Sequence, residues 1–211
     1  MATSLEELGP RARAKRAQVL AGARGVFLRQ GFAAASTDEI AREAGVSKRT
    51  LYAYYPSKEE LFAGVLRELT VENPQTRVID FVQGIEPRSP EELREALGGL
   101  ARKILTTIMG PDYLALLRTI IADSHRFPQI GEIFRSTVPE RGIREGSSML
   151  RRAQENGIVV PGDPEVMMRM FMGPLLTYAL VDGLFKPESE PQPPGPEKID
   201  EIVELYMKAI C

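Results

Sequence analysis

Residues 31–62 read GFAAASTDEIAREAGVSKRTLYAYYPSKEELF, and this stretch decides the fold expected for the N-terminal part of the chain. It predicts two short helices that meet at a tight turn, because Gly45 ends the first and Ser47 caps the second. Pro56 stops the second helix after barely two turns. This second helix carries polar and aromatic side chains instead of an apolar face. That layout is typical of a helix-turn-helix that reads DNA.

The flanking sequence completes a three-helix head. A first helix is predicted from about Arg11 to Gln30, because apolar residues recur on one stripe and Gly31 closes the pattern. Ser36 followed by Glu39 forms a capping box that opens the first helix of the motif. Leu51 is expected to pack the second helix of the motif against the other two helices of the head.

The remaining side chains of that second helix are expected to face outward. Polar residues on a short helix most often form a simple solvated face. Two tyrosines close to Lys48 and Arg49 are an uncommon choice for such a face, so the pattern favours contact with DNA. The outward set is Ser47, Lys48, Arg49, Thr50, Tyr52 and Tyr54.

Charge is distributed unevenly along the 211 residues, although the net charge is only −2. Residues 1–58 hold ten Lys or Arg against five Asp or Glu, a balance of +5, and the remainder holds 17 against 24, a balance of −7. A basic N-terminal unit on an acidic body suits a DNA-binding head whose body does not help to bind.

The whole chain is predicted to be all-α. Capping residues, glycines and prolines divide it into nine or ten helices, and no stretch shows a sustained strand-like alternation. The expected organisation is a flexible arm over residues 1–10, a helix-turn-helix domain over residues 11–56, and a helical effector-binding and dimerisation domain over residues 57–211.

The head resembles the TetR family of bacterial transcriptional regulators from about Val19 to Leu66. The segment from Leu116 to Pro128 resembles the AefR-like subgroup of C-terminal domains, less specifically. The head residues that carry the resemblance are Thr37-x-x-Ile40-Ala41, Ala44-Gly45-Val46-Ser47, Thr50-Leu51-Tyr52-x-Tyr54-Tyr55 and Ser57-Lys58-Glu59-x-Leu61.

The resemblance implies a dimeric repressor whose heads bind a palindromic double-stranded DNA operator and whose body binds a small, largely apolar effector. Lys48 and Tyr54 resemble the phosphate or groove anchors of the family, and Arg49 is expected to read a guanine edge through its two-pronged guanidinium. The positions that match DNA contacts of the family are Thr37, Ser47, Lys48, Arg49, Thr50, Tyr52, Tyr54 and Lys58.

Two late helices are candidates for a homodimer interface. Thr137 and Glu140 form a capping box, so a helix is expected from Thr137 to Asn156, and it carries a face of small residues at helical spacing. The segment from Pro164 to Phe185 is apolar nearly all round. Alternatively, both helices lie inside the core of one monomer. The interface candidates are Gly142, Gly146, Met149, Ala153, Met170 and Leu180.

The middle helices of the body carry apolar residues that are candidates for an effector pocket, although such stripes are more often plain core. Pro174 lies inside the long apolar segment and predicts a kink there, because proline removes one backbone hydrogen bond. The pocket candidates are Ile104, Ile108, Met109, Leu116 and Ile120.

The sequence argues against a catalytic residue, a cofactor or a metal site. His125 is the only histidine and Cys211 the only cysteine, and no Gly-rich phosphate loop or nucleophile motif is present. No apolar segment is long enough for a membrane span, so a cytoplasmic protein is expected. The alternatives to an effector-controlled regulator are a DNA-binding protein without an effector and, less strongly, a helical enzyme.

Overall fold

The computed structural model describes residues 9–73, 76–187 and 191–211. Within these ranges the chain consists of helices and loops, and no described residue belongs to a strand. The all-α prediction is confirmed. Most of the arm expected over residues 1–10 lies outside the described residues, and Pro10 already belongs to the first helix.

The chain divides into two compact units, which we call the head unit and the body unit. The head unit contains the residues up to Leu66 together with Thr119–Phe134, and the body unit contains Arg67–Arg118 together with Arg135–Cys211. This division differs from the expected boundary after residue 56. The head unit includes the first part of the helix Lys58–Leu69 and a segment from the middle of the chain, because their apolar side chains share its core.

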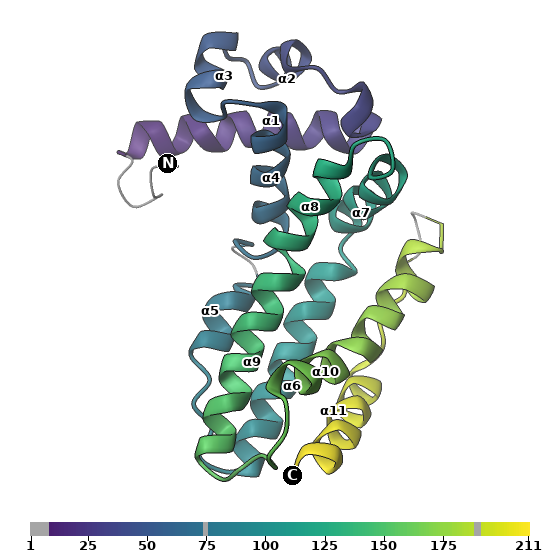
Figure 1. Cartoon of the computed structure of the whole chain (residues 1–211). Coiled ribbons are helices and arrows are strands. Elements are labelled where there is room, and N and C mark those ends of the chain that lie inside the picture. Colours follow the sequence, from purple (N-terminus) through teal and green to yellow (C-terminus); the bar gives the residue numbers. More distant parts are fainter. Residues whose placement is uncertain (1–8, 74–75, 188–190) are drawn as a thin grey trace. The chain divides into compact units, whose positions relative to one another are not determined.

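Four helices form the N-terminal part of the head unit (Figure 1): α1 (Pro10–Ala34), α2 (Thr37–Glu43), α3 (Lys48–Tyr54) and α4 (Lys58–Leu69). The predicted serine N-caps are present, since the Ser36 hydroxyl accepts a hydrogen bond from the Glu39 N–H at 3.2 Å and the Ser47 hydroxyl accepts one from the Thr50 N–H at 3.1 Å. The Glu39 carboxylate of the predicted capping box instead accepts a hydrogen bond of 2.6 Å from the side chain of Gln30. Gly31 interrupts α1 with a φ of 77°, which is where the sequence predicted its end.

The core of the head unit is built on the predicted stripe of α1. Phe27 is fully buried, and its ring centroid lies 5.3 Å from that of Phe62 on α4. At Gly22, a β-carbon would lie only 2.7 Å from atoms of Ala44. Glycine therefore allows α1 to approach the turn of the motif closely, which fixes the start of the second helix.

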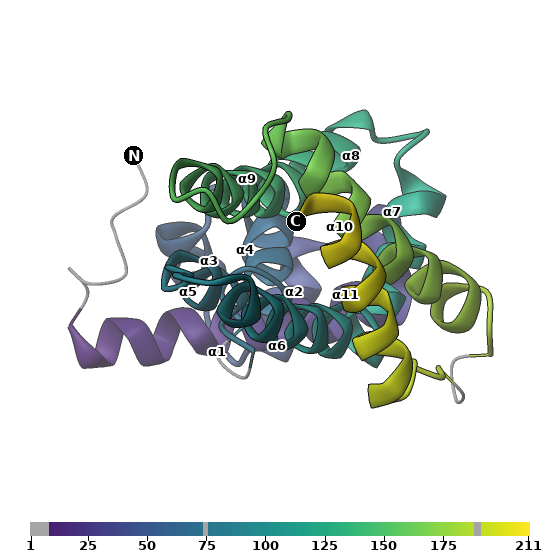
Figure 2. The same cartoon turned by 90° about the horizontal axis from the view of Figure 1, so that it is seen from below.

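The body unit is formed by the later helices, which pack in two pairs (Figures 1 and 2): α10 lies against α9, and α11 lies against α6. The helix α7 runs through the boundary of the two units, and most of α8 belongs to the head unit. The helices are α5 (Val78–Gln83), α6 (Pro90–Ile108), α7 (Pro111–Asp123), α8 (Pro128–Thr137), α9 (Pro139–Glu155), α10 (Pro164–Tyr178) and α11 (Pro196–Ile210).

Two details of the late helices differ from expectation. Thr137 ends α8 instead of capping the following helix, and α9 begins at Pro139 with Val138 at the cap position and no side-chain cap. The helix α10 continues through Pro174, where a kink was expected, and a π-helical segment, η2 (Ala179–Leu184), follows it. A π segment widens the helix locally and changes the direction of the side chains that follow.

Among the described residues, no single helix is long and apolar enough to cross a membrane. Only α6 and α7 taken together have the length and apolar composition of a membrane span, and these two helices are bent by 65° relative to each other.

Candidate DNA-binding surface

The second helix of the motif, α3, is held by one buried side chain and exposes most of the others. Leu51 is fully buried, and so is Ile40 on α2. Ser47, Lys48, Arg49 and Tyr52 are exposed, while Thr50 and Tyr54 are half-buried. The structure therefore places on one short helix the outward residues that the sequence predicted.

The turn between α2 and α3 depends on glycine. Gly45 has a φ of 61°, a left-handed conformation that residues with a β-carbon adopt at a cost. The side-chain amide of Gln18 on α1 donates a hydrogen bond of 2.7 Å to the Ala44 carbonyl beside this turn. Together these features fix the angle at which α3 leaves α2.

Two polar contacts join the start of α2 to α3. The hydroxyl groups of Thr37 and Tyr52 lie 3.1 Å apart, within hydrogen-bond distance. The Lys48 Nζ atom lies 2.7 Å from Oδ1 of Asp38. The hydrogen bond to this carboxylate raises the pKa of Lys48 above its ordinary value. Thr37, Lys48 and Tyr52 thus share one surface, and Asp38 is an acidic neighbour that the sequence prediction did not consider.

Arg49 is the exposed base of α3 that stays free. It makes no hydrogen bond or ion pair with any residue that the structure describes, whereas the neighbouring Lys48 is paired. The hydroxyl groups of Ser47 and Thr50 lie 2.8 Å apart at the start of α3. A guanidinium that is unpaired and exposed beside a helix N-terminus is well suited to contact a base edge or a phosphate.

Lys58 differs from the other members of the predicted set. Its Nζ atom donates hydrogen bonds of 2.8 Å to the carbonyls of Phe32 and Ala35, and it lies 4.3 Å from the centroid of the Phe32 ring. Burial lowers the pKa of Lys58 below its ordinary value. Two of the three N–H groups of this ammonium are therefore engaged within the head unit.

Asp123 is a residue of the head unit that the sequence did not single out for a role at the motif. One carboxylate oxygen, Oδ2, accepts hydrogen bonds from the backbone N–H groups of Phe32 and Ala33 at 3.1 and 3.0 Å. No sequence pattern connects residues so far apart, so only the fold reveals this contact. No group of three or more His, Cys, Asp or Glu among the described residues is arranged to hold a metal ion.

The candidate effector residues are packed into the interior of their units. Ile104, Ile108, Met109 and Leu116 are buried in the body unit, and Ile120 is buried in the head unit. None of them lines the cavity between α9 and the start of α10.

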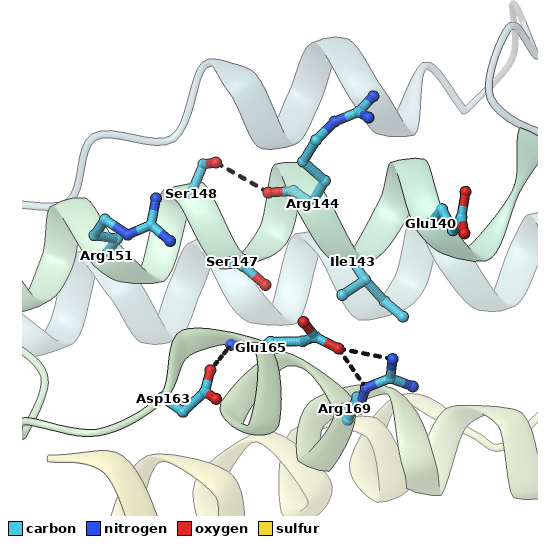
Figure 3. Close-up of a pocket in the computed structure, with 9 residues that line it drawn as sticks. All are labelled: Glu140, Ile143, Arg144, Ser147, Ser148, Arg151, Asp163, Glu165 and Arg169. Atoms are coloured by element: carbon cyan, nitrogen blue, oxygen red, sulfur yellow. Dashed lines mark hydrogen bonds and ion pairs between the residues drawn. The ribbon is translucent and has the colours of Figure 1, made fainter. Parts of the chain in front are cut away.

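A cavity of about 460 Å³ lies between α9 and the start of α10 (Figure 3). Arg169 binds Glu165 at 2.8 Å, and Glu140 is paired with Arg135 outside the cavity. The Ser147 hydroxyl is buried without a hydrogen-bond partner among the described residues. The walls are mainly charged and consist of Glu140, Ile143, Arg144, Ser147, Ser148, Arg151, Asp163, Glu165 and Arg169.

The face of small residues on α9 is occupied by the same chain. Met149 and Ala153 are fully buried, and a β-carbon at Gly146 would overlap the Sδ atom of Met168 on α10. This corrects the expectation that Gly146, Met149 and Ala153 form a dimer face, because the chain itself already buries all three. Gly142, at the first position of the series, is half-buried and has open space beside it.

The continuous helix of α10 and η2 exposes an apolar face instead. Met170 and Leu180, two of the predicted interface residues, are 50% and 42% exposed. They belong to a series at helical spacing, and Phe185, 78% exposed, follows at its end. Apolar side chains gathered on one face of a helix mark a surface that another protein surface can cover. The series comprises Val166, Met170, Leu176, Leu180 and Val181.

Known protein families match both the N-terminal and the C-terminal part of the chain. Residues 19–65 match the bacterial regulatory proteins of the tetR family, and residues 95–209 match the C-terminal domain of AefR-like transcriptional repressors. The second match alone covers more than half of the chain.

Individual relatives fall into two groups. The transcriptional repressor SCO4008 of Streptomyces coelicolor is 26% identical over 173 residues, which are 80% of this chain and 79% of that protein. The transcriptional activator FasR of Mycolicibacterium smegmatis is 49% identical over 53 residues only, which are 25% of this chain and 24% of that protein. The second similarity covers no more than a head-sized part of either protein.

Solved structures share the fold over almost the whole chain. The flavonoid-responsive regulator FrrA superposes with a TM-score of 0.66 at 31% identity and covers 93% of this chain and 97% of its own. A TetR-family regulator from Mesorhizobium loti superposes with a TM-score of 0.71 at 24% identity, covering 96% of this chain and 99% of its own. The chain therefore belongs to the TetR family of bacterial transcriptional regulators, with an AefR-like C-terminal domain.

Proposed function

We propose that this regulator binds a palindromic operator as a homodimer, represses transcription from it, and is released by a small, largely apolar effector. The observation that carries the proposal is the exposed polar face of α3, which Leu51 anchors and from which Arg49 projects without a partner among the described residues. A regulator of DNA has to share a compartment with the chromosome, so the proposal places the protein in the cytoplasm.

The exposed residues of α3 divide into positioning contacts and a reading contact. Ser47 and Thr37 lie at helix N-termini, where hydroxyl and N–H groups favour a phosphate oxygen. Lys48 and Tyr54 are proposed to bind the DNA backbone, and Thr50 and Tyr52 complete the surface that contacts DNA. Arg49 is proposed to donate two hydrogen bonds from its guanidinium to a guanine edge in the major groove, which is the commonest specific contact between a protein and a base.

The apolar face of α10 and η2 is the proposed dimer interface. A two-fold axis would bring the same face of two chains together, so that Met170 and Leu180 are covered by their counterparts. A pair of heads related by such an axis matches a palindromic site with half-sites roughly 34 Å or slightly more apart. Dimerisation would thus cover the exposed apolar side chains and would place the α3 helix of the second chain on the other half-site.

The effector has two candidate locations in the body unit. The buried cluster around Ile104, Ile108 and Leu116 would admit an apolar molecule if the helices part, and the 31% identical regulator FrrA is flavonoid-responsive. The cavity between α9 and α10 has the size of a ligand site but carries mainly charged walls. A bulky change at Leu116 and one at Ser147 would separate these locations.

Footprinting of the purified protein on the DNA upstream of its own gene tests the proposed function. We expect protection of two half-sites related by a dyad, and loss of this protection when the effector is added. A footprint that no small molecule weakens would support the alternative of a DNA-binding protein without an effector. Absence of sequence-specific protection, on this DNA and on DNA selected from a random pool, would contradict the proposal.

The same DNA-binding head serves activators and repressors, so the choice of repression rests on the similarity of the rest of the chain. The relative that aligns over a head-sized segment is described as an activator, and the relative that aligns over most of the chain is described as a repressor. Repression is proposed because the longer similarity includes the body. A reporter fused to the operator would show higher expression after deletion of the gene if this is right.

A further inference from the structure

Residues 31–36, which we call the α1–α2 link, comprise the last residues of α1 and the two residues before α2, and their backbone groups need partners. Gly31, with a φ of 77°, breaks the helical path of α1. The N–H groups that follow such a break have no carbonyl of the preceding turn to bind. Oδ2 of Asp123, at the end of α7, accepts the N–H groups of both Phe32 and Ala33. A carboxylate at the start of a helical turn is a strong capping group, and here it comes from a distant helix of the same unit.

Lys58 holds the same link from the other side. Its ammonium group donates to the carbonyls of Phe32 and Ala35, each at 2.8 Å, and covers the face of the Phe32 ring. Hydrogen bonds with one charged partner are about twice as strong as those between neutral groups. Phe32 is consequently fixed through its N–H, its carbonyl and its ring.

The ring of Phe32 fixes the link to the core. It is 1% exposed, and its centroid lies 5.3 Å from that of Phe62 and 5.7 Å from that of Phe127. The helix α2 begins at Thr37, two residues after Ala35. The link therefore determines where α2 starts, and α2 determines the angle of α3.

We propose that Asp123 and Lys58 are positioning residues for DNA binding, which hold the α1–α2 link in the conformation that presents α3. Neither side chain needs to touch DNA for this role. The inference rests on the proposed function of the head, but it assigns Lys58 a role different from the phosphate contact expected from the family resemblance. The two roles predict different responses to salt.

The salt dependence of binding separates the two roles of Lys58. Each phosphate contact that is lost makes the slope of log K against log salt concentration shallower by about 0.9. The variant Lys58→Met keeps the apolar stem and removes the ammonium group. We expect about tenfold weaker operator binding at an unchanged slope, as measured by fluorescence anisotropy. Because the homodimer carries two copies of Lys58, a slope that becomes shallower by about 1.8 would show a phosphate contact in each half-site and overturn the positioning role of Lys58.

Asp123 is tested by a pair of variants and a matched control. Asp123→Ala removes the acceptor, and we expect about tenfold weaker binding at an unchanged slope, whereas Asp123→Asn keeps one acceptor oxygen and should recover most of the affinity. The control Asp200→Ala removes a carboxylate that pairs with Arg102 in the body unit, and it should bind DNA like the unaltered protein. Wild-type affinity in a folded Asp123→Ala protein would overturn the inference.

The double variant Lys58→Met with Asp123→Ala tests whether both residues act through the same link. Two side chains that act through the same backbone segment have non-additive effects, so the double variant should bind only about as weakly as the weaker single variant. A loss of roughly one hundredfold, the product of two tenfold losses, would show independent effects and contradict a shared link. If Asp123→Ala does not fold, the slope measured with Lys58→Met still decides the role of Lys58.

Hydrogen exchange distinguishes failure of this inference from failure of the proposed function. In the absence of DNA, the amides of Phe32 and Ala33 should exchange faster in Asp123→Ala than in the unaltered protein, because their acceptor is gone. Unchanged exchange would refute the capping contact itself. A protein that shows this faster exchange but binds no DNA in any form would instead refute the proposed function.

Discussion

The Nζ atom of Lys48, on the exposed helix α3, lies 2.7 Å from Oδ1 of Asp38 on α2. Both side chains are well exposed, so this ion pair contributes little to the stability of the fold. Its consequence concerns binding. Asp38 competes with a phosphate oxygen for the ammonium group and adds a negative charge to the surface that is proposed to meet DNA.

Asp38→Asn should therefore tighten operator binding. We expect an increase in affinity of roughly threefold to tenfold and a slightly steeper salt slope, because Lys48 becomes free to neutralise a phosphate. The thermal unfolding midpoint should stay within about 2 °C of that of the unaltered protein. Anisotropy titrations at several salt concentrations measure both quantities. Weaker binding by Asp38→Asn would mean that the ion pair orients Lys48 and does not compete with DNA.

Two glycines one turn apart on α9 should respond in opposite ways to the same change. Gly146→Ala should lower the free energy of unfolding by about 1–3 kcal/mol, because the new methyl group displaces the buried Met168 side chain. Gly142→Ala should raise it by roughly 0.5–1 kcal/mol, because this site is helical and open. Urea unfolding of the two variants gives the comparison, and an undiminished stability of Gly146→Ala would argue against the packing of α9 on α10.

The exposed face of α10 and η2 should be required for dimerisation. Leu180→Glu places a charge on this face and should convert the protein from twice the chain mass to a single chain in sedimentation experiments at micromolar concentration. It should also abolish binding to the complete operator, because two linked heads are needed for both half-sites. The control Val160→Glu, at another exposed apolar residue, should remain dimeric. A dimeric Leu180→Glu protein would place the interface elsewhere.

The local features of the head could be predicted because they depend on neighbouring residues. Ser36, Ser47, Gly31 and Gly45 specify caps and turns within a few positions of themselves, and Leu51 stands out as the apolar residue of a polar helix. These signals gave the helix-turn-helix and its exposed face. The prediction that Thr137 caps the following helix was wrong, because Pro139 takes the first position of α9 and Val138 the cap position.

The long-range contacts could not be predicted because they depend on how the helices pack. A small-residue face such as that of Gly146 and Ala153 accepts any close helix, and the sequence does not say whether that helix belongs to the same chain. The roles of Lys58 and Asp123 have the same origin. Each binds the backbone near Phe32, and backbone groups leave no signature in the sequence.

The double variant Lys48→Ala with Arg49→Ala shows whether the exposed face of α3 reads DNA. Lys48→Ala alone should weaken binding to all sequences, and Arg49→Ala alone should relax the preference at one base pair, worth about 1–3 kcal/mol of discrimination. The decisive measurement is the affinity of the folded double variant for the footprinted promoter fragment. We expect loss of specific binding, and wild-type affinity for this fragment would show that the exposed face of α3 does not read DNA.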